Sequence, residues 1–181
     1  AVARLQSFTP NRPLPKIFQL TKDGKLIDGI FVGETINTPS MLCVEDAIDG
    51  LKWAEQVGGL AALIARSQQN LATLEAWVAA SDWIGFLCAE KASRSCTSVT
   101  FQLTDPWYHG LEAAAQAQAI KDLTGLLEKE GVAYDIGAYR DAPAGLRIWA
   151  GATVEHADIA ALLPWLDWAW QQVKSTAAKA A

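Results

Sequence analysis

The spacing of hydrophobic and polar residues divides the chain into two parts, and the first part is rich in turns. Apolar and β-branched residues lie on both sides of Asp23-Gly24, within 16–32, and predict a β-hairpin because Asp-Gly favours two-residue hairpin turns. Apolar residues at helical spacing then predict one helix before Gly58-Gly59 and a second over about 60–80. A hairpin and two helices do not complete a fold by themselves, so we expect this part to pack on another body.

After residue 82 the apolar period changes from helical to strand-like. Four apolar stretches predict strands, and they read WIGFLCA, CTSVTFQL, VAYDI (132–136) and LRIWA. A helix over 111–131, closed by Gly131, separates the strands into two pairs. A last helix from about 157 to 174 contains Pro164, which should kink it or mark a restart, and the alanine-rich end should fray. The order strand-strand-helix-strand-strand-helix predicts a two-layer α+β unit with its helices on one face.

Composition narrows the classes of protein that fit this pattern. Apolar residues make up 51% of the 181 residues, which allows a sizeable core, and the net charge of −5 argues against a nucleic-acid surface. Two histidines and three scattered cysteines argue against a dense metal cluster or a disulfide framework, and buried free thiols fit a reducing compartment. No apolar run approaches the roughly 20 residues of a membrane span, and no signal peptide is visible. The opening AVARLQSF resembles the tail of a helix, so we expect residues upstream of Ala1.

Eight tryptophans are unusual for this length, and most of them have core spacing. We expect core or subunit packing, rather than ligand stacking, for seven of them: Trp53, Trp77, Trp83, Trp149, Trp165, Trp168 and Trp170. Trp107 follows Pro106 in a loop and is expected to be exposed.

The stretch GETINTPSML places several hydrogen-bonding groups at the start of a predicted helix. Thr38 is a natural N-cap and Pro39 a natural first helical residue, so simple capping is one interpretation. The other is an anion site, since a helix N-terminus offers free N–H groups, to which Asn37 and Thr38 would add side-chain donors. Residue types alone favour capping, because most helices carry such residues.

Three arginines are candidates for binding anions. Arg147 begins a predicted strand among apolar neighbours, where a guanidinium requires a carboxylate or phosphate partner. That partner is either a ligand or an internal carboxylate, such as Asp135 or Asp141. Arg140 lies on a polar loop of the kind that carries ligand contacts, although a solvated arginine is the commoner outcome. For Arg94 a surface ion pair is favoured.

Two long stretches carry a resemblance to a known family. They read LPKIFQLTKDGKLIDGIFVGETINTPSMLCVEDAIDGLKWAEQVGGL and VAYDIGAYRDAPAGLRIWAGATVEHADIAALLPWLDWAW. Both resemble the C-terminal half of the phosphoserine aminotransferases, which are class V, fold-type I enzymes dependent on pyridoxal 5′-phosphate. The resemblance covers nearly the whole chain. It implies that 1–80 is the end of a large α/β domain and 81–181 a C-terminal small α+β domain.

The resemblance also implies an activity and roles for four residues. The family transfers the amino group of glutamate to 3-phosphohydroxypyruvate in serine biosynthesis, and in many bacteria also acts in pyridoxine biosynthesis. By likeness to its motifs, Asn37 and Thr38 would bind the cofactor phosphate of the other subunit of a homodimer. Arg147 would bind the substrate α-carboxylate, and Arg140 the substrate phosphate.

The resemblance leaves the reacting group outside this chain. The lysine that anchors the cofactor is expected upstream, in a missing N-terminal part, so no catalytic residue is expected here and the chain alone should be inactive. The resemblance further implies a cytoplasmic enzyme with no nucleic-acid or membrane partner. The alternatives are another class V enzyme, such as an alanine–glyoxylate aminotransferase or a cysteine desulfurase, and a free-standing α+β ligand-binding module. Cys96 lies in a predicted strand rather than on a mobile loop, which argues against a desulfurase.

Overall fold

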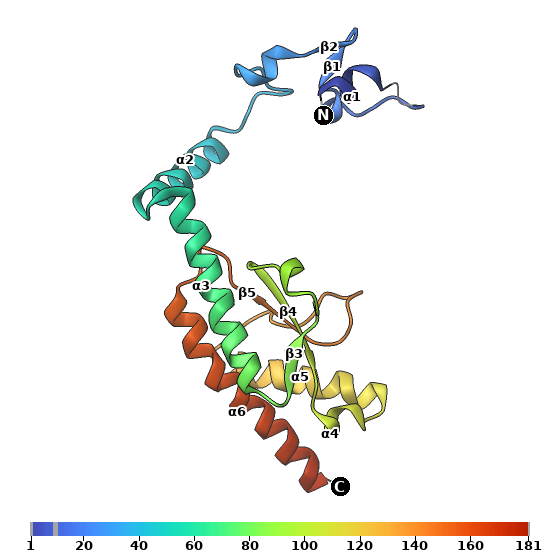
Figure 1. Ribbon diagram of the computed structural model, residues 1–181, viewed down its shortest axis with the longest axis vertical. Coiled ribbons are helices and arrows are strands. Elements are labelled where there is room, and N and C mark those ends of the chain that lie inside the picture. The colour runs from blue at the N-terminus through green and yellow to red at the C-terminus, as the bar shows by residue number, and fades with distance from the viewer. Residues whose placement is uncertain (1, 9–10, 181) are drawn as a thin grey trace. The chain divides into compact units, whose positions relative to one another are not determined.

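The computed structural model describes residues 2–8 and 11–180, which form two compact units (Figure 1). The first is Ala1–Trp53 and the second Ala54–Ala181, and each is described by itself. This division differs from the expected domain boundary near residue 80, which stays a prediction. Two earlier expectations touch residues outside the described ranges: a missing segment before Ala1 and a frayed end at Ala181.

The first unit contains the predicted hairpin in a short form. Its elements are α1 (Val2–Ser7), η1 (Lys16–Phe18), β1 (Thr21–Lys22), β2 (Lys25–Leu26), η2 (Asp28–Phe31) and the greater part of α2 (Met41–Gln56). Asp23 and Gly24 both have positive φ, 51° and 70°, as a two-residue turn that matches strand twist requires. The antiparallel pairing of Thr21 with Leu26 confirms the hairpin.

The start of α2 differs from the prediction that Thr38 caps the helix. The helix begins at Met41, and the carbonyl of Ser40 accepts the N–H of Val44 at 3.1 Å, so Ser40 occupies the N-cap position. Serine is at least as good an N-cap residue as threonine, and residue 38 precedes a proline, which disfavours helical backbone there. Thr38 and Asn37 therefore lie ahead of the helix rather than at its cap.

The first unit has no core of its own among its described residues. None of them is buried, and α2 exposes large apolar side chains, among them Met41, Leu42 and Leu51. Phe18 and Phe31 are also exposed, at 62% and 68%. The expectation that 1–80 does not close a core by itself is confirmed for the described part of 1–53, whereas the helix Gly59–Ala80 contributes Leu74 and Trp77 to the core of the second unit.

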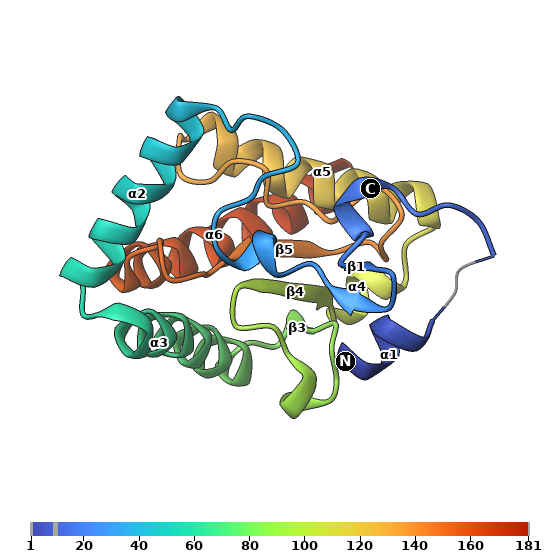
Figure 2. The same cartoon turned by 90° about the horizontal axis from the view of Figure 1, so that it is seen from above.

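The described part of the second unit combines four α-helices and one short 3-10 helix with a three-stranded sheet. Its elements are α3 (Gly59–Ala80), β3 (Ile84–Phe86), η3 (Lys91–Ser93), β4 (Ser98–Leu103), α4 (Pro106–His109), α5 (Ala113–Lys129), β5 (Leu146–Trp149) and α6 (His156–Ala180). The sheet is antiparallel in the order β3-β4-β5. Helix α6 packs against both α3 and α5, as Figure 2 shows.

Alternation along the strands gives the sheet one buried and one outer face. Val99, Phe101 and Leu103 of β4 are at most 2% exposed, and they belong to one core with the buried residues of α3, α5 and α6. The paired residues Thr100 and Arg147 lie on the outer face. The predicted mixed α/β class and its two layers are confirmed.

One of the four predicted strands is absent. Residues 132–136 form bends, and the only pairing nearby is an isolated bridge between Gly137 and Leu146. The reason is Asp135, whose φ of 52° is left-handed and interrupts an extended run. Even so, the carbonyl of Ile136 accepts the N–H of Arg147 at 2.8 Å, so this segment still lies along β5.

The two long helices of the second half end differently from each other. Helix α5 closes at Gly131, as predicted: Gly131 has φ 69°, and the N–H of Val132 donates to the carbonyl of Leu127 at 2.9 Å, which is a Schellman motif. Helix α6, by contrast, runs through Pro164 and on to Ala180, so both a restart at the proline and an end at 174 are wrong. Buried residues on both sides of Pro164, such as Ile159 and Leu166, hold the helix on the core.

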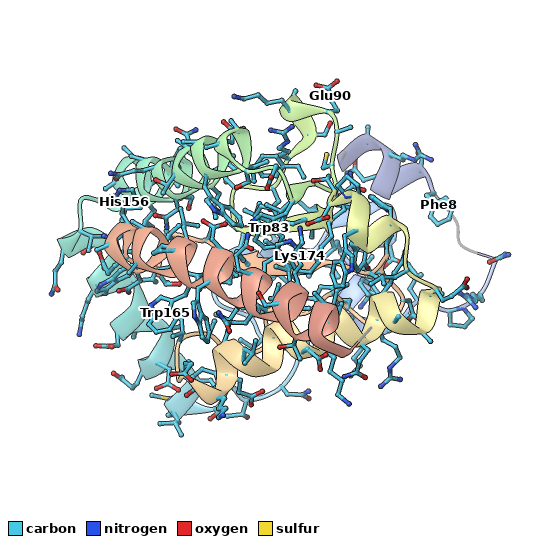
Figure 3. All side chains as sticks on the ribbon, turned by 90° about the horizontal axis from the view of Figure 1, so that it is seen from below. Phe8, Trp83, Glu90, His156, Trp165 and Lys174 are labelled. Atoms are coloured by element: carbon cyan, nitrogen blue, oxygen red, sulfur yellow. The ribbon has the colours of Figure 1, made fainter. Side chains whose placement is uncertain are left out.

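The tryptophans divide between the core and the surface. Trp77, Trp83 (labelled in Figure 3) and Trp170 are buried. The rings of Trp83 and Trp170 stack with centroids 5.2 Å apart. The predicted exposure of Trp107 is wrong, because its ring packs edge-on against Trp170. Trp149 and Trp165 are 54% and 39% exposed, so for these two the expected subunit packing stays a prediction.

The cysteines are less enclosed than their apolar neighbours suggested. All three are free thiols; Cys43 is exposed, and Cys88 and Cys96 are half-buried. The prediction of buried thiols is therefore wrong for Cys43, since α2 buries none of its residues.

Candidate functional site

Arg147 lies on the outer face of the sheet with most of its side chain enclosed. It pairs with Thr100 across β4 and β5, while its neighbours Leu146 and Ile148 point into the core. The Arg147 side chain is only 14% exposed. A guanidinium this enclosed requires polar partners, because a desolvated charge without them is costly.

The partners of Arg147 come from the segment that precedes β5. Its Nη2 donates to Oδ2 of Asp135 at 3.1 Å and to the carbonyl of Asp135 at 3.3 Å. The ring of Tyr139 lies over the guanidinium, with its centroid 4.4 Å from Cζ. The Nε atom is buried and lacks a partner among the described residues. The internal pair with Asp135 is thus confirmed, and it leaves part of the guanidinium unused.

A tight loop places Arg140 near the same strand. The N–H of Ala138 donates to the carbonyl of Gly145, and the N–H of Ala142 donates to the carbonyl of Tyr139, which closes a turn with Arg140 inside it. Arg140 is exposed, and its side chain has no partner within the described ranges. Arg140 therefore lies on the loop that leads into β5, and Arg147 lies on β5 itself.

Gly145 fixes the base of this loop. A Cβ at Gly145 would overlap the carbonyl oxygen of Phe101 on β4, so the backbone approaches the sheet more closely than any side chain allows. A Cβ at Gly137, on the other side of the loop, would meet nothing within 4 Å. The loop is thus held to the sheet at one specific position, two residues before Arg147.

Asn37 and Thr38 lie in the first unit, ahead of α2. Both residues are exposed, and neither side chain has a hydrogen-bond partner among the residues that the structure describes. The first three N–H groups of a helix have no intrahelical partner, so α2 adds free donors just beyond Ser40. This donor set of an amide, a hydroxyl and helix N–H groups suits the phosphate of pyridoxal 5′-phosphate. Asn37 and Thr38 belong to the first unit and Arg147 to the second, so a shared site remains a prediction.

Tyr139 is a site residue that the sequence did not reveal. It directly precedes Arg140 in the loop, and its residue type alone does not indicate a contact with Arg147. Arg94, by contrast, has a structural role, as expected. It pairs with Glu75 at 3.1 Å, lies 4.0 Å over the ring of Phe86 and donates to the carbonyl of Cys88.

The described residues also bear on two other classes of site, metal centres and membrane spans. No group of three or more histidine, cysteine, aspartate or glutamate residues there is placed to hold a metal ion. None of the described helices is long and apolar enough to cross a membrane.

The chain is similar to curated proteins over nearly its whole length. No family model matches the chain. Over 174 residues, 96% of the chain, it is 55% identical to a phosphoserine aminotransferase of Methanosarcina barkeri and 54% identical to that of Methanosarcina mazei. It is 28% identical over 158 residues to the phosphoserine aminotransferase of a Nocardioides species. The chain spans 44% of the length of each Methanosarcina protein.

Solved structures give the same result for the fold. The phosphoserine aminotransferase of Bacillus circulans subsp. alkalophilus matches 75% of this chain with a TM-score of 0.62 at 20% identity, and 34% of that protein is covered. Another phosphoserine aminotransferase, studied for radiation damage of its Schiff base, matches with a TM-score of 0.61 at 19% identity. The chain is therefore homologous, over 96% of its length, to proteins named phosphoserine aminotransferase, and it spans less than half the length of these curated Methanosarcina relatives.

Proposed function

We propose that this chain is the substrate-recognition part of a pyridoxal 5′-phosphate-dependent aminotransferase acting between glutamate and 3-phosphohydroxypyruvate. The observation that carries the proposal is 55% identity over 96% of the chain to a phosphoserine aminotransferase. Serine biosynthesis is the corresponding role in the cell. A related phosphorylated oxo acid of pyridoxine biosynthesis is a second candidate substrate.

Arg147 binds the α-carboxylate of the substrate in this proposal. Glutamate and phosphoserine both carry that group, so one arginine serves both half-reactions. The enclosure of Arg147 strengthens its attraction for an anion, because little water competes for the guanidinium. Tyr139 restricts the guanidinium from one side, which lowers the entropy cost of binding.

Arg140 binds the substrate phosphate. Its exposed position, without a partner among the described residues, leaves its full charge available to a ligand. The loop that carries it is joined to the strand of Arg147, so the carboxylate and the phosphate of one substrate are recognised by adjoining segments.

Asn37, Thr38 and the start of α2 bind the phosphate of pyridoxal 5′-phosphate, which withdraws electrons from the substrate when bound. The chain holds the phosphate through neutral donors, an amide, a hydroxyl and backbone N–H groups. The lysine that anchors the cofactor belongs to the part of the enzyme that this chain does not cover.

Two further bodies complete the enzyme in this proposal. One is the remainder of the large domain, and the other is a second copy of the subunit, which receives Asn37 and Thr38 at its cofactor. The absence of buried residues in the described part of 1–53 supports such partners, since its exposed apolar side chains need cover. We place the enzyme in the cytoplasm, where the reduced state of its three free cysteines would persist.

Amino transfer tests the function directly. The enzyme that contains this chain would be assayed with glutamate as amino donor and with 3-phosphohydroxypyruvate or glyoxylate as acceptor. We expect 3-phosphohydroxypyruvate to be preferred by at least tenfold in kcat/KM, because only this acceptor carries a phosphate for Arg140. A preference for glyoxylate would instead indicate an alanine–glyoxylate aminotransferase.

A further inference from the structure

The ion pair between Asp135 and Arg147 has two very unequal members. The Arg147 side chain is 14% exposed, whereas the Asp135 side chain is 93% exposed. The aspartate therefore stays in water while it contacts a mostly enclosed guanidinium. Such a carboxylate can leave at little cost in desolvation, because it has hardly been desolvated.

The pair is also incomplete. Only Nη2 of Arg147 donates to the Asp135 carboxylate, at 3.1 Å, and the second carboxylate oxygen makes no hydrogen bond to the guanidinium. Nε stays buried without a partner among the described residues. A guanidinium is best satisfied by two parallel hydrogen bonds to one carboxylate. Asp135 is therefore a weaker partner than a ligand carboxylate that approaches in the plane of the guanidinium and makes both bonds.

The backbone fixes Asp135 in this position. Its φ of 52° is left-handed, which non-glycine residues adopt rarely, although aspartate and asparagine tolerate it better than others. The carbonyl of Asp135 also accepts from Nη2, at 3.3 Å. This contact holds the segment against the arginine when the carboxylate swings away, so the site can exchange its anion without unfolding the loop.

We infer that Asp135 is an internal counter-ion that occupies Arg147 until the carboxylate of a ligand displaces it. Asp135 is thus a positioning residue that sets the affinity of Arg147 for carboxylates and keeps the guanidinium aligned between ligands. This inference rests on the proposed role of Arg147 in binding the α-carboxylate. Displacement involves no covalent step, and the released carboxylate returns to water.

The test uses the 181-residue chain, propionate as a small monocarboxylate ligand, and Asp135→Asn as the variant. Asparagine keeps the shape and the tolerance for left-handed backbone but removes the charge that competes with the ligand. The Nε–Hε signal of Arg147 would be followed by NMR at constant ionic strength. We expect Asp135→Asn to reach half-saturation at a propionate concentration about two- to fivefold lower than the wild type, the range expected for one exposed ion pair.

Two controls separate displacement from general electrostatics. Asp141→Asn removes the same charge from an exposed residue of the neighbouring loop that has no bond to Arg147. This variant should reach half-saturation at the same propionate concentration as the wild type. Propionamide, which has no charge, should not move the signal in any variant. The inference would be overturned if Asp135→Asn and the wild type reached half-saturation at the same propionate concentration. It would also be overturned if Asp141→Asn lowered that concentration as much as Asp135→Asn does, or if no variant responded to propionate. A failure of amino transfer in the full enzyme would leave this result intact, so the two proposals are tested separately.

Discussion

Lys174 of α6 donates from Nζ to Oδ2 of Asp105 at 2.7 Å, which ties the last helix to the residue that caps α4. The same carboxylate accepts the indole N–H of Trp170 at 3.0 Å and the backbone N–H of Trp107 at 2.8 Å. Asp105 is 5% exposed. One carboxylate thus joins the end of β4 to two tryptophans and a lysine, and it should be a principal polar anchor of the second unit.

Removing this carboxylate should destabilise the second unit. Asp105→Ala would leave the Trp170 N–H buried and Lys174 without its partner, so we expect the free energy of unfolding to fall by about 2–3 kcal/mol. Asp105→Asn keeps an acceptor for Trp170 and should cost less. Urea unfolding followed by circular dichroism measures both, and a loss below about 0.5 kcal/mol for the alanine variant would refute the anchoring role.

The same carboxylate should make stability depend on pH in the acid range. Burial would raise the pKa of Asp105, but the hydrogen bonds from Lys174, Trp107 and Trp170 outweigh it, and the pKa lies below the ordinary value of 3.8. The unfolded state therefore takes up the proton first. The stabilisation is complete above about pH 3.8 and is lost as the pH falls through the folded-state pKa. The stability difference between wild type and Asp105→Asn should accordingly shrink between pH 6 and pH 3, and a constant difference would contradict this assignment.

Two glycines of the loop before β5 should respond differently to alanine. Gly145→Ala forces a Cβ onto the carbonyl oxygen of Phe101, so the pairing of β4 with β5 must shift, at a cost of about 2 kcal/mol or more. Gly137→Ala meets nothing within 4 Å and should change the free energy of unfolding by less than about 0.5 kcal/mol. Thermal unfolding of the two variants measures this difference. Equal stabilities of Gly145→Ala and Gly137→Ala would refute the close approach at Gly145.

Helix α5 offers a pair of glycines with opposite expected signs. Gly131 has φ 69° at the helix end, so Gly131→Ala should destabilise by about 1 kcal/mol. Gly125 lies exposed within the helix with open space around it, so Gly125→Ala should stabilise by about 0.5–1 kcal/mol. Urea midpoints that move in the same direction for both variants would contradict the assigned helix end.

Local chemistry accounts for the features that the sequence predicted well. The turn at Asp23-Gly24 and the helix end at Gly131 depend on residues whose backbone preferences act within a few positions. Arg147 was also found as a candidate, because an arginine among apolar strand residues requires an anionic partner. Its choice between Asp135 and Asp141 could not be predicted, since that depends on a left-handed backbone at a residue other than glycine.

Tertiary packing decided the features that the sequence predicted badly. Trp107 lies on Trp170, which is 63 positions away in the chain, so its loop context gave no sign of burial. A restart of α6 at Pro164 is one of the two outcomes that the sequence predicts, but core contacts on both sides of the proline hold the helix continuous. Tyr139 contacts Arg147 only because the intervening loop folds back, which no residue pattern in the loop announces.

Asn37 and Thr38 should affect the cofactor site of the opposite subunit. Mixed dimers would combine one subunit carrying Asn37→Ala and Thr38→Val with one subunit lacking the cofactor-anchoring lysine. If the donors act across the interface, cofactor affinity falls at the site of the subunit that keeps its own Asn37 and Thr38. Cofactor binding and dimerisation should then strengthen each other by the same free energy. A defect confined to the site of the substituted subunit would show that the donors act within their own chain.

The most direct test of the account is the kinetics of the Arg147→Ala enzyme with glutamate. An enclosed, charge-assisted carboxylate contact contributes about 1.5–3 kcal/mol, so kcat/KM for glutamate should fall at least tenfold. Arg147→Lys should recover only part of this loss, because an ammonium group cannot form the paired hydrogen bonds of a guanidinium. Arg140→Ala is the matched control, and it should weaken the phosphorylated substrates while leaving glutamate nearly unchanged. Unaltered kinetics with glutamate in Arg147→Ala would show that the arginine serves only its pair with Asp135, and the central claim would be wrong.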